Sequence, residues 1–332
     1  MRGTITLSGA ATDTGSGLNN VAFQYKLSSG STWVTACSDT TTPYSCTFDT
    51  TTIADGLYDF RALATDNAGN QTASASQTNR RIDNTAPTVT PTDPGRYVRG
   101  NVTLGGTAAD AGSGIVSIVL EGRAVGSGTW VTVCTSTTSP LTCTYDTTTI
   151  ADGAYEIQLT ATDAAGNTTT SPIVTPINVD NTAPTAASIA TTNGGTAGRP
   201  DTGDTAVYGF SEPIKPASIL AGWTGTSTPV TVRLTQGATN TMTIWNAANT
   251  TQLSLGSVTI GTAWITASAT FNATMVMSGN NVTVTLGTQT AGTVATSNAT
   301  FAMVWSPSAS ATDLAGNPMN TATRTAAAVR LF

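Results

Sequence analysis

Polar and apolar residues alternate along short stretches of this chain, and clusters of Gly, Asn, Asp and Ser separate the stretches. The segment 155–162 shows the alternation most clearly, with apolar side chains at Tyr155, Ile157, Leu159 and Ala161 and polar ones between them. A period of two is typical of a β-strand with one buried face. The segment 58–64 repeats the same apolar positions, and no long stretch has the 3.6-residue period of a helix. The pattern therefore predicts an all-β fold.

The alternating segments belong to an internal repeat. Asp110 follows Asp13 by 97 positions, and Trp130 follows Trp33 by the same 97 positions, so no insertion or deletion separates the copies. The run 49–56 reappears unchanged as 146–153. A repeat of about 100 residues with frequent turns has the size of an immunoglobulin-like β-sandwich. Tyr58 and Tyr155 open equivalent strands after Asp-Gly, at the place of the tyrosine corner in such sandwiches.

The complete second copy allows its strands to be assigned. We predict strands at residues 88–92, 102–107, 116–123, 130–134, 141–145, 155–162 and 168–179. The first copy starts at the equivalent of residue 98 and so lacks the opening strand. Two explanations remain open: the chain is a piece of a longer tandem array, or another subunit supplies the strand. The predicted domains are residues 1–84, 85–181 and 182–332.

The third segment, residues 182–332, is longer and has no cysteine. Its alternating stretches predict strands, with one helical turn at 215–220; the strands are 230–234, 242–245, 270–277, 282–286 and 301–305. We interpret it as a larger, divergent β-sandwich.

The four cysteines form two local pairs, Cys37 with Cys46 and Cys134 with Cys143. Even, local pairing predicts disulfides and an oxidising, extracytoplasmic setting, whereas reduced thiols would fit a cytosolic protein. The cysteines stand in Thr- and Ser-rich surroundings without metal-type partners, which favours disulfides. Each bridge is expected to pin the loop between two consecutive strands.

Composition excludes several classes of function. The chain has 13 Lys and Arg, 19 Asp and Glu and no His, for a net charge of -6. This balance disfavours nucleic acid, which binds through clustered cations, and it removes the commonest general base. There is no Ser/His/Asp or Cys/His set and no phosphate-binding glycine loop, so we expect no enzyme. No apolar stretch is long enough to span a membrane, and no signal peptide is expected at Met1.

Two motifs connect the repeats. Asp-x-Ala-Gly-Asn closes a strand at residues 66–70, 163–167 and 313–317, and Asp-Asn-Thr-Ala-Pro-Thr follows at 83–88 and 180–185. Over residues 1 to 185 they resemble the tandem immunoglobulin-like domains of bacterial surface proteins and adhesins. The segment Phe210-Ser-Glu-Pro-Ile214 resembles the related domains of S-layer and other exported proteins. The resemblance implies stalks, spacers or adhesive tips outside the cell.

Acidic residues recur where strands end. Strand directions bring the acidic residues of the linker and of two strand ends to one pole of the second domain. The same geometry predicts a second acidic group in the third domain, with Asp201 or Asp204 as a further member of that group. The candidate ligands are Asp13, Asp66, Asp83, Asn84, Asp110, Asp163, Asp180, Asn181 and Asp313. Ca²⁺ takes six to eight oxygen ligands, and the resemblance implies Ca²⁺ at such junctions. The alternative is that these side chains only cap turns.

The third segment contains four of the six Trp residues, and Trp223 and Trp245 are candidates for a sugar-stacking surface, although such residues are more often core anchors. The leading hypothesis is a non-enzymatic stalk or filament of an extracellular surface protein. Its partners would be neighbouring Ig-like domains or subunits, with surface glycans or a host protein as ligands. The alternatives are a phage virion appendage and an accessory carbohydrate-binding part of a secreted enzyme.

Overall fold

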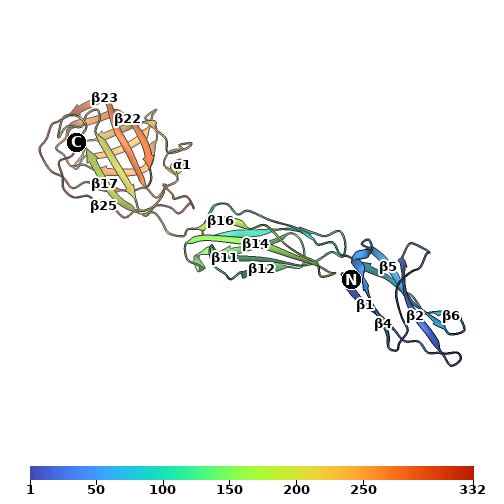
Figure 1. Cartoon of the computed structure of the whole chain (residues 1–332). Helices are drawn as coiled ribbons and strands as arrows, with labels where there is room; N and C mark the ends of the chain where they lie inside the picture. The colour runs from blue at the N-terminus through green and yellow to red at the C-terminus, as the bar shows by residue number, and fades with distance from the viewer. The chain divides into compact units, whose positions relative to one another are not determined.

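A computed structural model describes residues 1–332, and Figure 1 shows its cartoon. About 54% of the chain is strand and about 3% is helix, as the alternating pattern predicts. The chain divides into two compact units, one of residues 1–96, 101–145 and 154–177, the other of residues 97–100, 146–153 and 178–332. No helix is both long and apolar enough to cross a membrane.

The first repeat is a sandwich of two sheets. One sheet pairs β1 (Thr4–Gly9) with β4 (Tyr44–Asp49). The other has the order β3-β2-β5-β6, and β7 also pairs with β5; the bounds are Val34–Asp39, Leu18–Leu27, Gly56–Asp66, Gln71–Ala73 and Gln77–Ile82 for β3, β2, β5, β6 and β7. The core between the sheets includes Phe23, Phe48 and Phe60.

Tyr58 at the start of β5 forms the predicted tyrosine corner. Its ring is buried, and its hydroxyl donates a 2.9 Å hydrogen bond to the Ala54 carbonyl four residues upstream. The bond satisfies the phenol while the ring adds to the core, so the turn after the Thr50–Thr52 3-10 helix is fixed to the strand that follows it.

The second repeat has the same plan with two more strands, β8 and β9. One sheet has the order β13-β10-β8, with bounds Leu141–Asp146, Asn101–Ala109 and Thr88–Pro91. The other has the order β12-β11-β14-β16-β9, and β15 pairs with β14; the bounds are Val131–Ser136, Ile115–Ala124, Gly153–Asp163, Val174–Val179, Tyr97–Val98 and Thr168–Thr170. Ile157, Leu159 and Ala161 of β14 are buried, as the period of two predicts.

The prediction of a single strand over 168–179 is wrong, because β15 and β16 are separate. Between them, the Ser171 hydroxyl accepts a hydrogen bond from the Leu159 N–H and donates one to the Pro172 carbonyl. Pro172 has no N–H to continue the ladder. The chain therefore leaves the sheet edge at Ser171 and returns to it at Val174.

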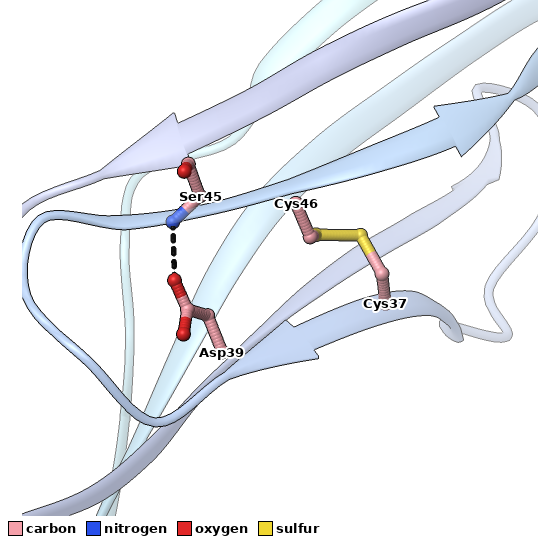
Figure 2. The surroundings of a disulfide bond; sticks show 4 residues. All are labelled: Cys37, Asp39, Ser45 and Cys46. Atoms are coloured by element: carbon pink, nitrogen blue, oxygen red, sulfur yellow. Dashed lines mark hydrogen bonds between the residues drawn. A yellow bond between two sulfur atoms is a disulfide. The ribbon is translucent and has the colours of Figure 1, made fainter.

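The disulfides connect the two sheets of each sandwich. Figure 2 shows Cys37 on β3 bonded to Cys46 on β4, and these strands belong to different sheets. Cys134 on β12 and Cys143 on β13 are placed in the same way, with Cα atoms 6.6 Å apart. Each bridge closes the loop between two consecutive strands, as expected, and because those strands belong to different sheets it also ties the sheets together at one edge. The connecting loop is fixed separately, because Asp39 Oδ2 accepts a 2.9 Å hydrogen bond from Ser45 N.

The third domain is one continuous sheet of nine strands in the order β17-β18-β23-β22-β19-β20-β21-β24-β25. In that order, the bounds are Ala186–Thr192, Thr205–Phe210, Asn281–Val294, Ile265–Ser278, Thr228–Thr235, Thr241–Asn246, Gln252–Thr259, Val304–Ser306 and Arg324–Thr325. The edge strands β17 and β25 lie beside each other, so the sheet folds back on itself around a large core (Figure 1). The helix α1 (Pro216–Ile219) is the predicted helical turn. The sequence pattern missed β17, β18, β21 and β25.

Candidate functional site

Each linker between domains begins with an Asp-Asn pair, and the Asn side chain binds the domain that precedes it. Asn84 Oδ1 accepts hydrogen bonds from Gly3 N at 2.8 Å and Thr50 Oγ1 at 3.0 Å. The backbone N–H of Asn84 donates a hydrogen bond to Asp55 Oδ1 at 2.8 Å. Asn181 makes the same three contacts with Gly100, Thr147 and Asp152. The two Asn side chains thus fasten each linker to the domain before it, and their prediction as metal ligands stays a prediction.

The Asp of the first pair binds the domain that follows. Asp83 is fully buried, and its Oδ2 accepts a 2.6 Å hydrogen bond from Ser113 N. A Cβ at Gly112 would collide with the Asp83 carboxylate, so this turn needs glycine for the close approach. Asp83 and Asn84 are adjacent in sequence but bind different domains.

Asp83 meets two carboxylates from the second repeat. Oxygen atoms of Asp83, Asp110 and Asp163 all lie within 4.8 Å of one another. Asp110 accepts from Gly114 N at 2.6 Å, and Asp163 accepts from Asn167 N at 2.8 Å. The three acidic groups that strand directions placed at one pole are therefore together in the structure.

The second cluster consists of Asp180, Glu212 and Asp313, again with oxygens within 4.8 Å of one another. Burial, followed by the charges of Asp180 and Asp313, raises the pKa of Glu212 to about 7. Asp201 and Asp204 are not in this cluster, and Asp204 instead accepts hydrogen bonds from Gly194 N and Asp201 N. Sequence reasoning missed Glu212 as a member of this cluster, although it stands in the Phe-Ser-Glu-Pro-Ile motif.

Asp13 and Asp66 of the first repeat are turn caps. Asp13 Oδ2 accepts from the N–H groups of Gly15 and Gly17, at 3.1 and 2.6 Å. Asp66 accepts from Asn70 through both the backbone N–H and Nδ2, and the side-chain bond is the largest cause of its lowered pKa. Both are outside the two carboxylate clusters, so the structure gives neither a third acidic partner.

The last residue of the Asp-x-Ala-Gly-Asn motif holds the linker. Asn167 is 5% exposed, and its Nδ2 donates to the Asp83 carbonyl at 2.9 Å and to Asp163 Oδ2 at 2.7 Å. Asn317 repeats this with the Asp180 carbonyl at 2.8 Å. These Asn residues were not predicted as functional, although the repeated motif ends on them.

The tryptophans of the third domain do not form an open platform. Trp223 is buried in the core, and its Nε1 donates to the Thr226 carbonyl. Trp264 and Trp305 are also buried. Trp245 is half-buried, with the Arg233 guanidinium 3.5 Å from its ring centroid. The prediction of sugar stacking is wrong for Trp223, because no face of its ring is accessible.

Comparison with known proteins places the chain among bacterial domains. The family described as "Bacterial Ig domain" matches residues 1–62 and 87–159, and the "Bacterial Ig-like domain (group 3)" matches residues 140–212. A comparison with curated proteins found no match.

Among solved structures, the chain is similar to fibronectin(III)-like modules of Clostridium thermocellum CbhA, with 20% identity, 53% of this chain and 83% of that chain covered, and a TM-score of 0.33. It is also similar to a tetra-tandem repeat in the extending region of a large adhesion protein, with 18% identity, coverage of 97% and 84%, and a TM-score of 0.27. The two family matches, the 97-residue repeat and the two-sheet domains agree: this chain belongs to the proteins built from tandem bacterial immunoglobulin-like domains.

Proposed function

We propose that this chain is a structural segment of an exported bacterial surface protein, in which the linkers hold neighbouring domains in a fixed orientation. Domains of these families are structural or adhesion-type extracellular modules and are typically non-catalytic. Two disulfides agree with an oxidising, extracytoplasmic location.

One observation carries the proposal: the Asp-Asn pair of the linker is divided between two domains. Asn84 binds Gly3 and Thr50 of the first repeat, whereas Asp83 binds Ser113 of the second. A flexible tether would leave these groups in water. Fixing adjacent residues on opposite sides restricts the backbone dihedrals through which the two domains would rotate. A stalk needs this property, and a small-molecule site does not.

We further propose that Ca²⁺ occupies both carboxylate clusters. Asp83, Asp110 and Asp163 would hold one ion, and the cluster of Asp180, Glu212 and Asp313 the other. The donor set fits a hard cation, because all six side chains offer carboxylate oxygens. Neither ion pair of the chain, Lys26 with Asp59 or Arg123 with Glu156, involves these groups, so no side-chain cation forms an ion pair with either cluster.

The test is a thermal melt of the full chain in Ca²⁺ and in EGTA, under non-reducing conditions. Ca²⁺ at about one hundred times its dissociation constant adds about 2.7 kcal/mol if it binds only the folded state. Asp163→Asn should remove the part of the shift that comes from the first cluster. The matched control is Asp66→Asn at the equivalent position of the first repeat, where no cluster exists, and it should retain the full shift.

A midpoint that does not respond to Ca²⁺ would leave the acidic residues as turn caps and remove the metal from the proposal. The stalk itself has a separate test. Spin labels on the first and second repeats should give a narrow distance distribution, and Asp83→Ala should broaden it. A distribution equally broad in both proteins would refute a fixed junction.

A further inference from the structure

At both junctions, an arginine of the domain before the linker contacts the closing turn of the domain after it. The closing turn is the Asp-x-Ala-Gly-Asn motif at residues 163–167 and 313–317. Arg2 Nη1 donates a 3.3 Å hydrogen bond to Asn167 Oδ1. A Cβ at Gly166 would lie 3.4 Å from Arg2 Nε, so the guanidinium also packs against the turn itself. Arg99 is the equivalent of Arg2, 97 positions later, and a Cβ at Gly316 would lie 3.6 Å from its Nε.

The turn does not need the arginine in order to form. Gly69, Gly166 and Gly316 have φ angles of 90, 93 and 92°, so the backbone is the same in all three copies of the motif. In the first copy, nothing lies within 4 Å of a Cβ built at Gly69. The arginine contact is therefore a property of the junction and not of the turn.

Arg2 binds the end of the Asn167 amide that the linker does not use. Asn167 is 5% exposed, and its Nδ2 donates to the Asp83 carbonyl at 2.9 Å and to Asp163 Oδ2 at 2.7 Å. Its Oδ1 accepts from Arg2. A flipped amide would turn Oδ1 toward two oxygens and Nδ2 toward a cation, which would replace attraction by repulsion at both ends. Arg2 therefore favours the orientation in which Asn167 holds the linker.

The charge of Arg2 also acts on the first carboxylate cluster through this one amide. The guanidinium binds Oδ1 of Asn167, and Nδ2 of the same amide binds Asp163. A cation at the acceptor end polarises an amide and strengthens the bond that its other end donates. Arg2 thus stabilises the ionised Asp163 without forming an ion pair with it.

The residue after each arginine binds the linker. Gly3 N donates to Asn84 Oδ1 at 2.8 Å, and Gly100 N donates to Asn181 Oδ1 at 2.9 Å. Both glycines have a positive φ, 61 and 58°, and a Cβ at either would meet nothing within 4 Å. The backbone conformation, and not close packing, therefore requires glycine here. Each Arg-Gly dipeptide contacts the linker with one residue and the following domain with the other.

We propose that Arg2 and Arg99 are the positioning residues of the two junctions, and that each holds the closing turn of the following domain against the linker without a bound metal. This inference rests on the fixed junction of the proposed function. It adds the group on the preceding domain that recognises the following one. A domain with Arg-Gly before its first long strand is then the partner that an Asp-x-Ala-Gly-Asn turn accepts.

The test is hydrogen exchange of the full chain in EGTA, measured at the backbone amides of the two closing turns. Residues 166–167 report on the first junction and residues 316–317 on the second, because these amides donate to the Asp that opens each turn. Arg2→Met should accelerate exchange at 166–167 about fivefold, the effect of losing one ordinary hydrogen bond, and leave 316–317 unchanged. Arg99→Met should accelerate exchange at 316–317 and leave 166–167 unchanged.

Three further variants serve as controls. Arg80→Met removes an exposed arginine of the same repeat whose Nη2 donates to Gln77 on its own strand, so both turns should exchange as in the parent. Arg2→Lys keeps a cationic donor and should stay closer to the parent than Arg2→Met does. In an Asn167→Ala background, Arg2→Met should have a smaller effect at residue 166 than in the parent, because its hydrogen-bond partner is already absent.

Three results would overturn the proposal. The first is the same exchange at residues 166–167 in Arg2→Met and Arg80→Met. The second is equal acceleration of both turns by Arg2→Met, which would indicate general destabilisation. The third is an equal effect of Arg2→Met with and without Asn167. A broad spin-label distribution in the parent protein is a different result, because it would refute the fixed junction itself and this inference with it.

Discussion

Asn167→Ala is the substitution that isolates the junction between the first two repeats. In the parent protein, Asn167 Nδ2 donates to the buried carbonyl of Asp83 and to Asp163 Oδ2. Alanine removes both bonds and leaves the Asp83 carbonyl without this donor. A buried polar group left unsatisfied costs about 1–3 kcal/mol, so we expect a loss of about 2 kcal/mol. For a domain of about 100 residues this lowers Tm by roughly 8–16 °C.

The repeat itself supplies the control. Asn70 occupies the equivalent position and makes the same local bonds to Asp66, but it is exposed and contacts no linker. Asn70→Ala should therefore cost only about 0.5 kcal/mol. Calorimetry of both variants separates the turn from the junction, because the difference between them measures the contacts of Asn167 outside its own turn, with the Asp83 and Thr85 carbonyls and with Arg2. Equal losses in the two variants would show that the motif stabilises only its own turn.

Three further predictions concern single groups. Replacing Cys134 and Cys143 together by Ser releases a short closed loop, so it should lower the free energy of unfolding of the second repeat by about 2–3 kcal/mol. Denaturant titrations would measure this, and no loss would show that the bridge adds no constraint. The hydrogen bond from Lys26 is the largest cause of the lowering of the Asp59 pKa to about 2. The stabilising contribution of ionised Asp59 is therefore present above about pH 4 and should disappear between about pH 4 and 2. Lys26→Met should raise the Asp59 pKa toward 3.8 in an NMR titration, and an unchanged value would contradict the pairing. Because the pKa of Glu212 is raised from 4.5 to about 7, stability should fall as pH rises through that interval; Glu212→Gln should flatten the Ca²⁺-free profile, and an unaltered slope would assign it to another group.

The sequence predicted the fold of the repeats well because the strand signal is local. Alternation at Ile157, Leu159 and Ala161 needs only neighbouring residues to be visible, and all three are buried. The third domain was harder, because the edge strands β17 and β25 are defined by their contact with distant parts of one sheet. The disulfides show the same limit: the pairing followed from spacing, but the fact that Cys37 and Cys46 lie on different sheets did not.

The candidate site, too, was predicted from the sequence only in part. Strand directions were enough to bring Asp83, Asp110 and Asp163 to one pole, since the ends of strands are fixed by topology. They were not enough to separate Asn84 from Asp83, because that depends on which side of the backbone each side chain leaves. Glu212 was missed because it comes from the turn after β18, which the pattern did not identify as a strand.

One motif in three environments explains how these junctions are built. Asp66, Asp163 and Asp313 all accept a hydrogen bond from the backbone N–H of the Asn four residues later, so the turn forms by itself in each domain. Asp163 and Asp313 are 1% exposed, whereas Asp66 is much more exposed. In the second and third copies the linker residues Asp83 and Asp180 lie against the turn, and their carbonyls accept hydrogen bonds from Asn167 and Asn317. The turn therefore forms from its own residues, and how deeply it is buried depends on the segment that precedes the domain. A domain fused before the first repeat through an Asp-Asn-Thr-Ala-Pro linker should bury Asp66 to the same degree, and chemical protection of its carboxylate would measure this.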